Sequence, residues 1–388
     1  MRKMKKVAAL LLVMIMTLSM MACSSGAAGD AEKEEDTDTV SNETVEESGN
    51  EEDKGAVVNV DTQAAASGNE YVMQKAPSEY KVFCYWPAPD TFFDSYCLEG
   101  IEAFEAQYGV DVEWMVGTDW TQDIENQSVE AMAASGYDLF MILSADSSGA
   151  NSLYKELRDN GCHVINYCNK VDDPAQCEAM FSSDNSVNAY ASAKELCERM
   201  GGEGKIIHVL ENLNDVNTKI RQEAVEKAVA EYPGITICQT VADITTVDEG
   251  YEKVTDAIAS NPDATGMICC AGTASKGVAN ALADYYGSNP DANHIYCATM
   301  DQAEEVLAGI KKGQIDYTVA QNGWAMGYVS ALSLCMLDDG WVPVTDGQFI
   351  DTGYIFIDQN NVDTWQSDIE AAATELIASL ETKWFKQP

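Results

Sequence analysis

The strongest constraint on the fold of this chain is the alternation, after residue 80, of short apolar runs with longer amphipathic stretches. Runs such as Asp138–Leu143 and Lys205–Leu210 are rich in Leu, Ile, Val and Met, and the segments after them repeat apolar residues at helical spacing. Strands this apolar are buried on both faces, and helices between them indicate βαβ units and parallel sheets. We therefore predict an α/β fold.

The expected elements fall into two similar series. The first has strands at 81–85, 110–114, 138–143 and 163–167, with helices at 93–108, 122–134 and 151–160. The second begins with a helix at 186–200 and has strands at 205–210, 235–240, 266–270 and 294–298, with helices at 217–232, 248–260 and 274–287. Two such series predict two Rossmann-like lobes with parallel sheets. Ligands of open sheets bind beyond the carboxyl ends of the strands, so the loops after 85, 143, 167, 210, 270 and 297 are candidate binding loops.

The first thirty residues indicate export. Four basic residues between Arg2 and Lys6 precede the apolar run Val7–Met16, which is too short to span a bilayer and is followed by small residues. This pattern is typical of a secretory signal peptide. Met20-Met21-Ala22-Cys23 resembles the bacterial lipobox, in which a cysteine is lipidated and becomes the new N-terminus. The resemblance implies a lipid anchor on Cys23, with residues 1–23 as the signal and lipidation site.

The charge of the chain restricts its partners. Between Asp30 and Lys54 there are twelve acidic and two basic residues and no aromatic one, so we expect residues 24–77 to be a disordered acidic tether. The whole chain has a net charge of −41. Because attraction to phosphates needs the opposite sign, we expect no nucleic-acid partner, and contact with the membrane only through the lipid.

Cysteine and histidine do not indicate a metal or catalytic site. Without Cys23, eleven of the twelve cysteines remain, and none lies in a C-x-x-C pair. We expect them to be mostly reduced and buried, although a bridge such as Cys168–Cys177 stays open. His163, His208 and His294 fall at or inside predicted strands, where structural roles are more common.

Signatures of common enzymes and nucleotide sites are missing from the sequence. It contains no G-x-x-x-x-G-K-[ST], G-x-G-x-x-G or G-x-S-x-G motif. We therefore expect a protein that is not an enzyme and needs no cofactor or metal. A surface hydrolase on the same sheet architecture remains an open, less favoured alternative.

Aromatic residues gather at the first strand exit. The loop reads Tyr85-Trp-Pro-Ala-Pro-Asp-Thr-Phe-Phe93. Because neighbouring residues of a helix point about 100° apart, Phe92 and Phe93 cannot both face the core. An aromatic ring can lie against the C–H face of a sugar while carboxylates and amides bind its hydroxyls. The loop is therefore a candidate sugar-binding surface.

Five segments, in order, resemble the ribose-type (type 1) periplasmic binding proteins. These are Asp90–Gly100, Gly136–Leu143, Ser182–Asn185, Ile310–Gln321 and Asp351–Ile357. The resemblance covers roughly residues 78 to 365 and implies two lobes that are joined by a three-crossover hinge and close on a monosaccharide. It implies an N-terminal lobe of residues 78–183 plus 322–351 and a C-terminal lobe of 184–321 plus 352–388. Its hinges fall at Ser183-Asp184, Gln321-Asn322 and Asp351-Thr352.

The resemblance also implies the ligand-binding residues. Asp90 would bind hydroxyls, Phe92 and Phe93 would stack on the ring, and Asp301 and Gln321 match a binding aspartate and the hinge glutamine. Cys168, Asn169 and Lys219 stand where the family has an aspartate and two arginines, and Arg221 is assigned a structural role. Trp86 and Tyr167 would add aromatic surface. The expected set is Trp86, Asp90, Phe92, Phe93, Tyr167, Cys168, Asn169, Lys219, Asp301 and Gln321.

Together these features predict an extracytoplasmic solute-binding lipoprotein, held on the outer face of the cell membrane. It would capture a monosaccharide or sugar-like ligand and deliver it to the permease of an ABC transporter, acting as a monomer. Asp172–Cys177 also resembles a segment of the subgroup that binds autoinducer-2, so the identity of the sugar stays open. A sensor that presents its closed form to a signalling receptor is the alternative that sequence does not separate.

Overall fold

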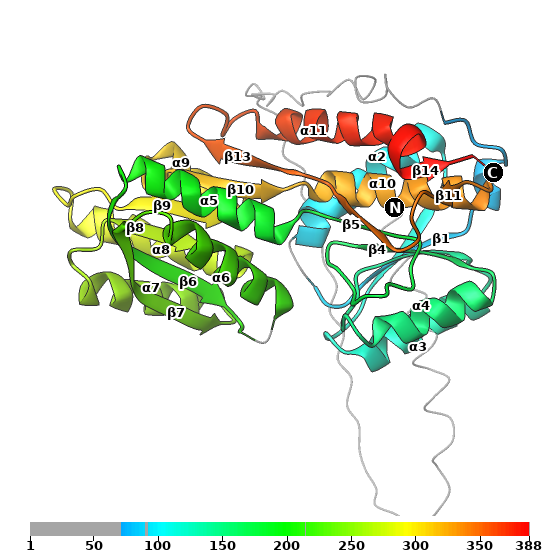
Figure 1. Cartoon of the computed structure of the whole chain (residues 1–388), viewed down its shortest axis with the longest axis horizontal. Helices are drawn as coiled ribbons and strands as arrows, with labels where there is room; N and C mark the ends of the chain where they lie inside the picture. Colours follow the sequence, from blue (N-terminus) through cyan, green and yellow to red (C-terminus); the bar gives the residue numbers. More distant parts are fainter. Residues whose placement is uncertain (1–70, 90–91, 214, 388) are drawn as a thin grey trace, which may run out of the picture. The chain divides into compact units, whose positions relative to one another are not determined.

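The structure is a computed structural model that describes residues 71–89, 92–213 and 215–387. Two six-stranded sheets form its framework (Figure 1). The first has the order β12-β5-β4-β3-β1-β2 and the second β13-β10-β9-β8-β6-β7. All neighbouring strands are parallel except β13, which runs antiparallel to β10. The predicted α/β class with two lobes is therefore confirmed.

The strands of the first sheet are short and apolar because helices cover both faces. They are β1 (Val82–Trp86), β2 (Val112–Val116), β3 (Leu139–Ile142), β4 (His163–Tyr167), β5 (Ala179–Ser182) and β12 (Gln348–Asp351). The helical elements between them are η2 (Phe93–Cys97), α2 (Leu98–Tyr108), α3 (Gln122–Ala134) and α4 (Ala150–Asp159). A short helical turn, η1 (Pro77–Glu79), precedes β1. The predicted strands and helices of this lobe lie within a few residues of these bounds.

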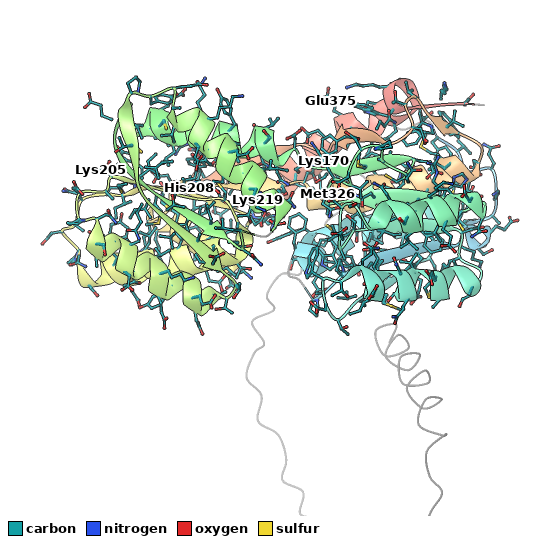
Figure 2. The ribbon with its side chains drawn as sticks, turned by 60° about the horizontal axis from the view of Figure 1, so that its bottom comes forward. Lys170, Lys205, His208, Lys219, Met326 and Glu375 are labelled. Atoms are coloured by element: carbon teal, nitrogen blue, oxygen red, sulfur yellow. The ribbon has the colours of Figure 1, made fainter. Side chains whose placement is uncertain are left out.

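The second sheet repeats this arrangement. Its strands are β6 (Glu203–Glu211), β7 (Gly234–Ile244), β8 (Gly266–Cys269), β9 (Tyr296–Met300), β10 (Tyr317–Gln321) and β13 (Tyr354–Asp358). Its helices are α5 (Asn185–Arg199), α6 (Val216–Val229), α7 (Val247–Ser260), α8 (Gly272–Ser288) and α9 (Glu304–Lys311). Helices α5 and α6 pack together, as do α7 and α8, and His208 lies inside this lobe (Figure 2).

The chain passes between the two sheets three times. It leaves the first sheet after β5 at Ser183-Asp184, returns after β10 at Asn322, and leaves again between β12 and β13 at Thr352-Gly353. These crossings confirm the predicted three-crossover hinge. Helix α10 (Gly323–Asp338), which follows the second crossing, packs on α2 and on strands of the first sheet.

Two glycines bring α2 and α10 unusually close. A Cβ atom on Gly100 would lie 1.9 Å from the Trp324 carbonyl oxygen, and one on Gly327 would lie 2.1 Å from the Cys97 carbonyl oxygen. Any side chain at either position would push the helices apart. The two helix backbones are thus in direct contact.

The C-terminal segment departs from the expected lobe boundary. Residues 352–388 were expected in the C-terminal lobe, but β14 (Phe385–Lys386) pairs with β11 (Val342–Pro343), which follows α10. The segment reaches it through α11 (Trp365–Ser379), which packs on both α10 and β13, and through η3 (Leu380–Trp384). The end of the chain therefore returns to the lobe of the first sheet.

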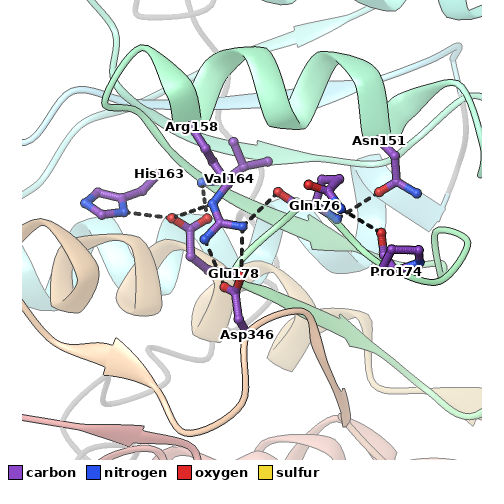
Figure 3. A network of polar contacts seen from close by, with 8 residues as sticks. All are labelled: Asn151, Arg158, His163, Val164, Pro174, Gln176, Glu178 and Asp346. Atoms are coloured by element: carbon purple, nitrogen blue, oxygen red, sulfur yellow. Dashed lines mark hydrogen bonds and ion pairs between the residues drawn. The ribbon is translucent and has the colours of Figure 1, made fainter.

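Polar contacts fasten the amino-terminal edge of the first sheet (Figure 3). Glu178 accepts a hydrogen bond from the Val164 amide at 2.8 Å and contacts His163 Nδ1 at 2.9 Å. Arg158 on α4 lies 3.3 Å from the same carboxylate and donates to both carboxylate oxygens of Asp346. This network ties α4, β4 and the segment before β12 together, at the edge opposite the strand exits.

Asp339, just after α10, fixes the beginning of the described chain. Its carboxylate accepts hydrogen bonds from the hydroxyls of Tyr71, at 2.6 Å, and Tyr80, at 2.8 Å, and from the Gln74 amide at 2.9 Å. Burial raises the pKa of Tyr71 and raises that of Tyr80 to about 12, so both hydroxyls remain donors. Lys75 adds an ion pair to the neighbouring Asp338 at 2.6 Å.

Candidate ligand-binding site

A cavity of about 1280 Å³ is lined by residues from both lobes. Much of its lining comes from the carboxyl ends of parallel strands and the loops directly after them, where open α/β sheets bind ligands, and residues of helices, many of them on α6, also line it. The exits of the first sheet contribute Trp86, Leu143, Ser144, Cys168, Asn169 and Ser182, and those of the second contribute Glu211, Asn212, Thr245, Gly272, Asp301 and Gln321.

An aromatic wall borders the cavity on the side of the first lobe. The rings of Trp86 and Phe92 stack with their centroids 6.4 Å apart, and Tyr96 meets Phe92 edge-to-face at 5.5 Å. The start of α10 permits this packing, because a Cβ on Gly323 would lie 3.0 Å from the Phe92 ring. Trp120, after β2, adds a further ring that is 49% exposed, and sequence reasoning missed both Tyr96 and Trp120.

Two of the expected aromatic contacts lie behind this wall. Phe93 is 0% exposed and packs between Trp86 and Trp114, with centroid distances of 5.1 and 5.8 Å. The helical turn that directs Phe92 to the cavity rotates Phe93 into the core. Tyr167 is also 0% exposed and packs edge-to-face on Trp86, with centroids 5.8 Å apart, and the next residue, Cys168, lines the cavity instead. Neither side chain lines the cavity.

Asp90, the expected hydroxyl-binding residue of the first loop, lies outside the described residues. Its neighbours in the described part, Pro89 and Phe92, do line the cavity.

Asn169 is held in place by its own lobe. Its side chain accepts a hydrogen bond from the Ser144 hydroxyl at 3.0 Å and donates to the Ser144 carbonyl at 2.9 Å. Asn166, buried in β4, donates to the Asn169 carbonyl at 2.7 Å and itself accepts from Tyr154 at 2.8 Å. These contacts fix the two loops after β3 and β4 relative to each other.

A chain of polar side chains forms the wall of the second lobe. Gln321 donates to Asp301 at 3.0 Å, and its carbonyl oxygen lies 3.5 Å from Nη2 of Arg221. The Arg221 guanidinium donates through Nε and Nη2 to Asn185 at 3.1 and 2.8 Å, and Asn185 donates to Asn217 at 2.9 Å. Within the described residues no ion pair to a carboxylate involves Arg221.

Helix geometry explains why Arg221, and not Lys219, faces the cavity. Residues four apart on α6 share a face, so Asn217 and Arg221 both line the cavity. Lys219, two positions from each, is exposed and is not among the residues that line the cavity. The resemblance assigned Lys219 to the ligand and Arg221 to a structural role, but of the two only Arg221 lines the cavity. The spacing of four residues between Asn217 and Arg221, on a helix that the sequence predicts, could have indicated that they share a face.

Glu211 is a further carboxylate that sequence reasoning missed. It ends β6, lines the cavity and accepts a hydrogen bond from the Ala274 amide at the start of α8, at 3.0 Å. Burial raises the pKa of this carboxyl group. Beside it, a Cβ on Gly272 would lie 2.6 Å from a carboxylate oxygen of Asp301, so only glycine allows Asp301 to approach the first turn of α8. Two carboxylates thus meet at one helix N-terminus, where the helix dipole favours negative charge.

Cys168 and Asp301 occupy equivalent places in the two sheets. Each follows the third strand of its sheet, β4 or β9, and has a left-handed backbone, with φ of 66° and 63°. Each donates its amide at 2.8 Å to the adjacent strand, Cys168 to Phe181 and Asp301 to Val319. Such a conformation is costly for residues other than glycine, so the surrounding structure must hold it.

Ser183 links the three crossings beside the cavity. Its hydroxyl donates to the Gly353 carbonyl at 2.5 Å and accepts from the Asn322 amide at 3.2 Å. It also lies 3.3 Å from the Thr352 hydroxyl. One side chain therefore contacts all three hinge segments.

The histidines are separate from the cavity lining. His163 contacts Glu178, and His294 pairs with Asp316 at 3.0 Å, which raises the pKa of His294. His208 is 0% exposed, and burial lowers its pKa to about 4. Among the described residues, no group of three or more His, Cys, Asp or Glu side chains is placed to hold a metal ion. No helix in the same part of the chain is long and apolar enough to cross a membrane.

Comparisons with known proteins agree with this geometry. An ABC transporter solute-binding protein from Burkholderia graminis C4D1M, solved in complex with D-arabinose, has a TM-score of 0.67 and 21% identity, covering 75% of this chain and 99% of that one. One from Bacillus halodurans C-125 with bound myo-inositol has a TM-score of 0.64 and 18% identity, covering 76% and 99%.

Sequence comparison leads to the same group of proteins. A protein of Rhizobium meliloti that is named for the binding of rhizopine is 20% identical over 260 residues, which are 65% of this chain and 82% of that protein. A family model described as a periplasmic binding protein domain matches residues 82–340. The chain therefore belongs to the periplasmic binding protein domain family and has the fold of the sugar-binding solute receptors of ABC transporters.

Proposed function

We propose that this chain is an extracytoplasmic lipoprotein that captures a monosaccharide or a similar ring-shaped polyol between its lobes and delivers it to an ABC transporter. The observation that carries the proposal is the pairing, in one cavity, of the Trp86 and Phe92 rings with the polar wall of Arg221, Asp301 and Gln321. The D-arabinose and the myo-inositol bound by the Burkholderia and Bacillus proteins support the same class of ligand.

The chemistry of the two walls suits a polyol. A sugar ring has C–H faces that pack on aromatic rings and a rim of hydroxyls that both donate and accept hydrogen bonds. On the polar wall, the carboxylate of Asp301 would accept from hydroxyls, and the guanidinium of Arg221 would donate to their oxygens. Gln321 and Asn169 would supply further amide contacts. No step of this proposal needs a cofactor or a catalytic group.

Lobe closure would convert binding into a signal for the transporter. A ligand that contacts both walls at once binds the closed form more tightly than the open form. Only such a difference in affinity can shift the equilibrium between the open and closed forms. This proposal is supported by the contacts of Ser183 between the crossings and by the hydrogen bond from Arg221 to Asn185, directly after the first crossing, because both lie beside the segments that would rotate.

A ligand panel tests the proposal. Differential scanning fluorimetry with pentoses, hexoses and cyclic polyols, including D-arabinose and myo-inositol, should find at least one ligand that raises the melting temperature. A ligand at a hundredfold excess over its Kd stabilises by about 2.7 kcal/mol. Calorimetry of Asp301→Asn, which keeps a residue that tolerates the left-handed backbone, should then show about 10- to 100-fold weaker binding.

Asp256→Asn, an exposed change on α7, is the matched control and should bind as the native protein does. A complete panel without a stabilising ligand, or unchanged affinity in Asp301→Asn, would refute the assignment of this cavity.

The anchor is tested separately. Cells that express the native chain should retain it in the membrane fraction, and Cys23→Ser should release it or leave it with an uncleaved signal. Because an uncleaved signal would also hold the variant in the membrane fraction, labelled palmitate is the deciding readout: no label in the native chain, or equal label in both forms, would refute the lipid anchor without affecting the ligand assignment. We also propose that the protein acts as a monomer, which sedimentation velocity checks directly.

A further inference from the structure

Two thiols, one in the cavity wall and one behind it, are in contact. Cys97 ends η2, Cys168 follows β4, and their sulfur atoms lie 3.5 Å apart. Cys168 is partly exposed and lines the cavity, whereas Cys97 is 0% exposed. A solute in the cavity can therefore reach the first sulfur, and the second lies directly behind it.

The surroundings hold both cysteines in this arrangement. The Cys168 amide donates a hydrogen bond to the Phe181 carbonyl at 2.8 Å. The Cys97 carbonyl oxygen lies directly against Gly327 of α10, so close that a side chain at this glycine would collide with it. Within the part of the chain that the structure describes, neither cysteine forms a disulfide. A disulfide needs sulfur atoms about 2.05 Å apart, so side-chain rotation from van der Waals contact is the movement that would join them.

We propose that Cys97 and Cys168 form a redox-active thiol pair, which reacts with small-molecule disulfides that enter the cavity and closes to an intramolecular disulfide. Cys168 loses its proton and its thiolate attacks the incoming disulfide, which forms a mixed disulfide and releases one thiol. Cys97 then loses its proton and attacks the Cys168 sulfur, which releases the second thiol. The small disulfide is reduced by two electrons as the protein pair is oxidised.

The closed pair would change the binding wall. Cys97 lies in the same short helical segment as Phe92 and Tyr96, so the new bond would join the aromatic wall to the exit of β4. It would also draw the Cys168 sulfur away from the cavity surface. The redox conditions around the protein would in this way change the shape of the ligand site. This inference does not depend on which ligand binds there.

Peptide mapping tests the proposal. The native full chain is incubated with oxidised glutathione, blocked with an alkylating agent and digested without reductant, and the linked peptides are identified by mass spectrometry. The expected product joins the Cys97 peptide to the Cys168 peptide. Cys168→Ser should lose this product completely, and Cys97→Ser should accumulate a glutathione adduct on Cys168.

Cys162→Ser is the matched control, because Cys162 is also partly exposed and belongs to the same lobe. It should retain the Cys97–Cys168 product in full. The proposal is overturned if native Cys168 keeps a glutathione adduct beside a reduced Cys97, if it links to another cysteine, or if it stays unmodified while Cys162 reacts. Circular dichroism of each variant separates these outcomes from misfolding.

Discussion

A buried carboxyl group should make the stability of the first lobe depend on pH. Glu125 on α3 is 0% exposed and accepts hydrogen bonds from the Ala145 amide at 2.6 Å and from the Gln122 side chain at 3.0 Å. Burial outweighs these contacts and raises its pKa from 4.5 to about 7. Ala145 lines the cavity, so Glu125 also supports a binding loop.

The magnitude follows from linkage. The folded protein holds the Glu125 proton more tightly than the unfolded chain, so this group's contribution to stability is present at low pH and is lost as pH rises towards 7. With a pKa of about 7 in the folded state and 4.5 in the unfolded state, the free energy of unfolding should fall by about 2.5 kcal/mol between pH 5 and pH 8 because of this group alone.

Glu125→Gln should remove that dependence. A neutral amide can keep the bond from Ala145, and the Gln122 carbonyl oxygen, which has no hydrogen-bond partner among the described residues, can accept from the new amide nitrogen. The difference in unfolding free energy between variant and native protein should therefore shift in favour of the variant by about 2.5 kcal/mol from pH 5 to pH 8.

Urea denaturation at several pH values, with Glu130→Gln as an exposed control on the same helix, measures this shift. A constant difference across the pH range, or an equal shift in Glu130→Gln, would refute the reasoning.

Three further changes test the packing, the hinge and the polar wall. Gly327→Ala places a methyl group 2.1 Å from the Cys97 carbonyl oxygen and should lower the free energy of unfolding, measured by urea denaturation, by about 1–3 kcal/mol. Gly287→Ala, with open space around it, should not destabilise the protein. Equal effects of the two changes would contradict the close helix contact. Ser183→Ala removes the hydroxyl that joins the crossings and should lower stability by about 1–3 kcal/mol in the same assay, and no change would show that the hinge does not need it. Arg221→Lys loses the planar fork and should weaken calorimetric binding of the panel ligand about tenfold, whereas unchanged affinity would remove Arg221 from the proposed site.

The eight strands that the sequence predicted could be located because their burial pattern is local, whereas β5 and β12 were not among the predicted strands. Every residue of Val82–Trp86 is buried, and such continuous apolar runs read as strands without knowledge of their partners. Helix α10 was not predicted as an element, because a helix is recognised from the sequence by alternating apolar and polar faces. Fifteen of its residues, Gly323–Leu337, are buried, so it has no polar face and no helical periodicity to reveal it.

The candidate site was predicted in part. Trp86, Phe92, Cys168, Asn169, Asp301 and Gln321 line the cavity, because strand exits can be located from the sequence. Directions of neighbouring side chains were harder. Phe93 and Lys219 were placed by resemblance, but each lies on the wrong face of its helical segment. Cys97 and Cys168 are 71 positions apart in the sequence, and no local sequence pattern predicts their contact.

The fastening of Tyr71 to Asp339 has a mechanical consequence. Any tension that reaches Tyr71 from the preceding chain enters the protein at the end of α10, in the lobe of the first sheet. If residues 24–77 act as the predicted tether, the protein is therefore held by the lobe of the first sheet, and the lobe of the second sheet is the one that moves relative to the point of attachment.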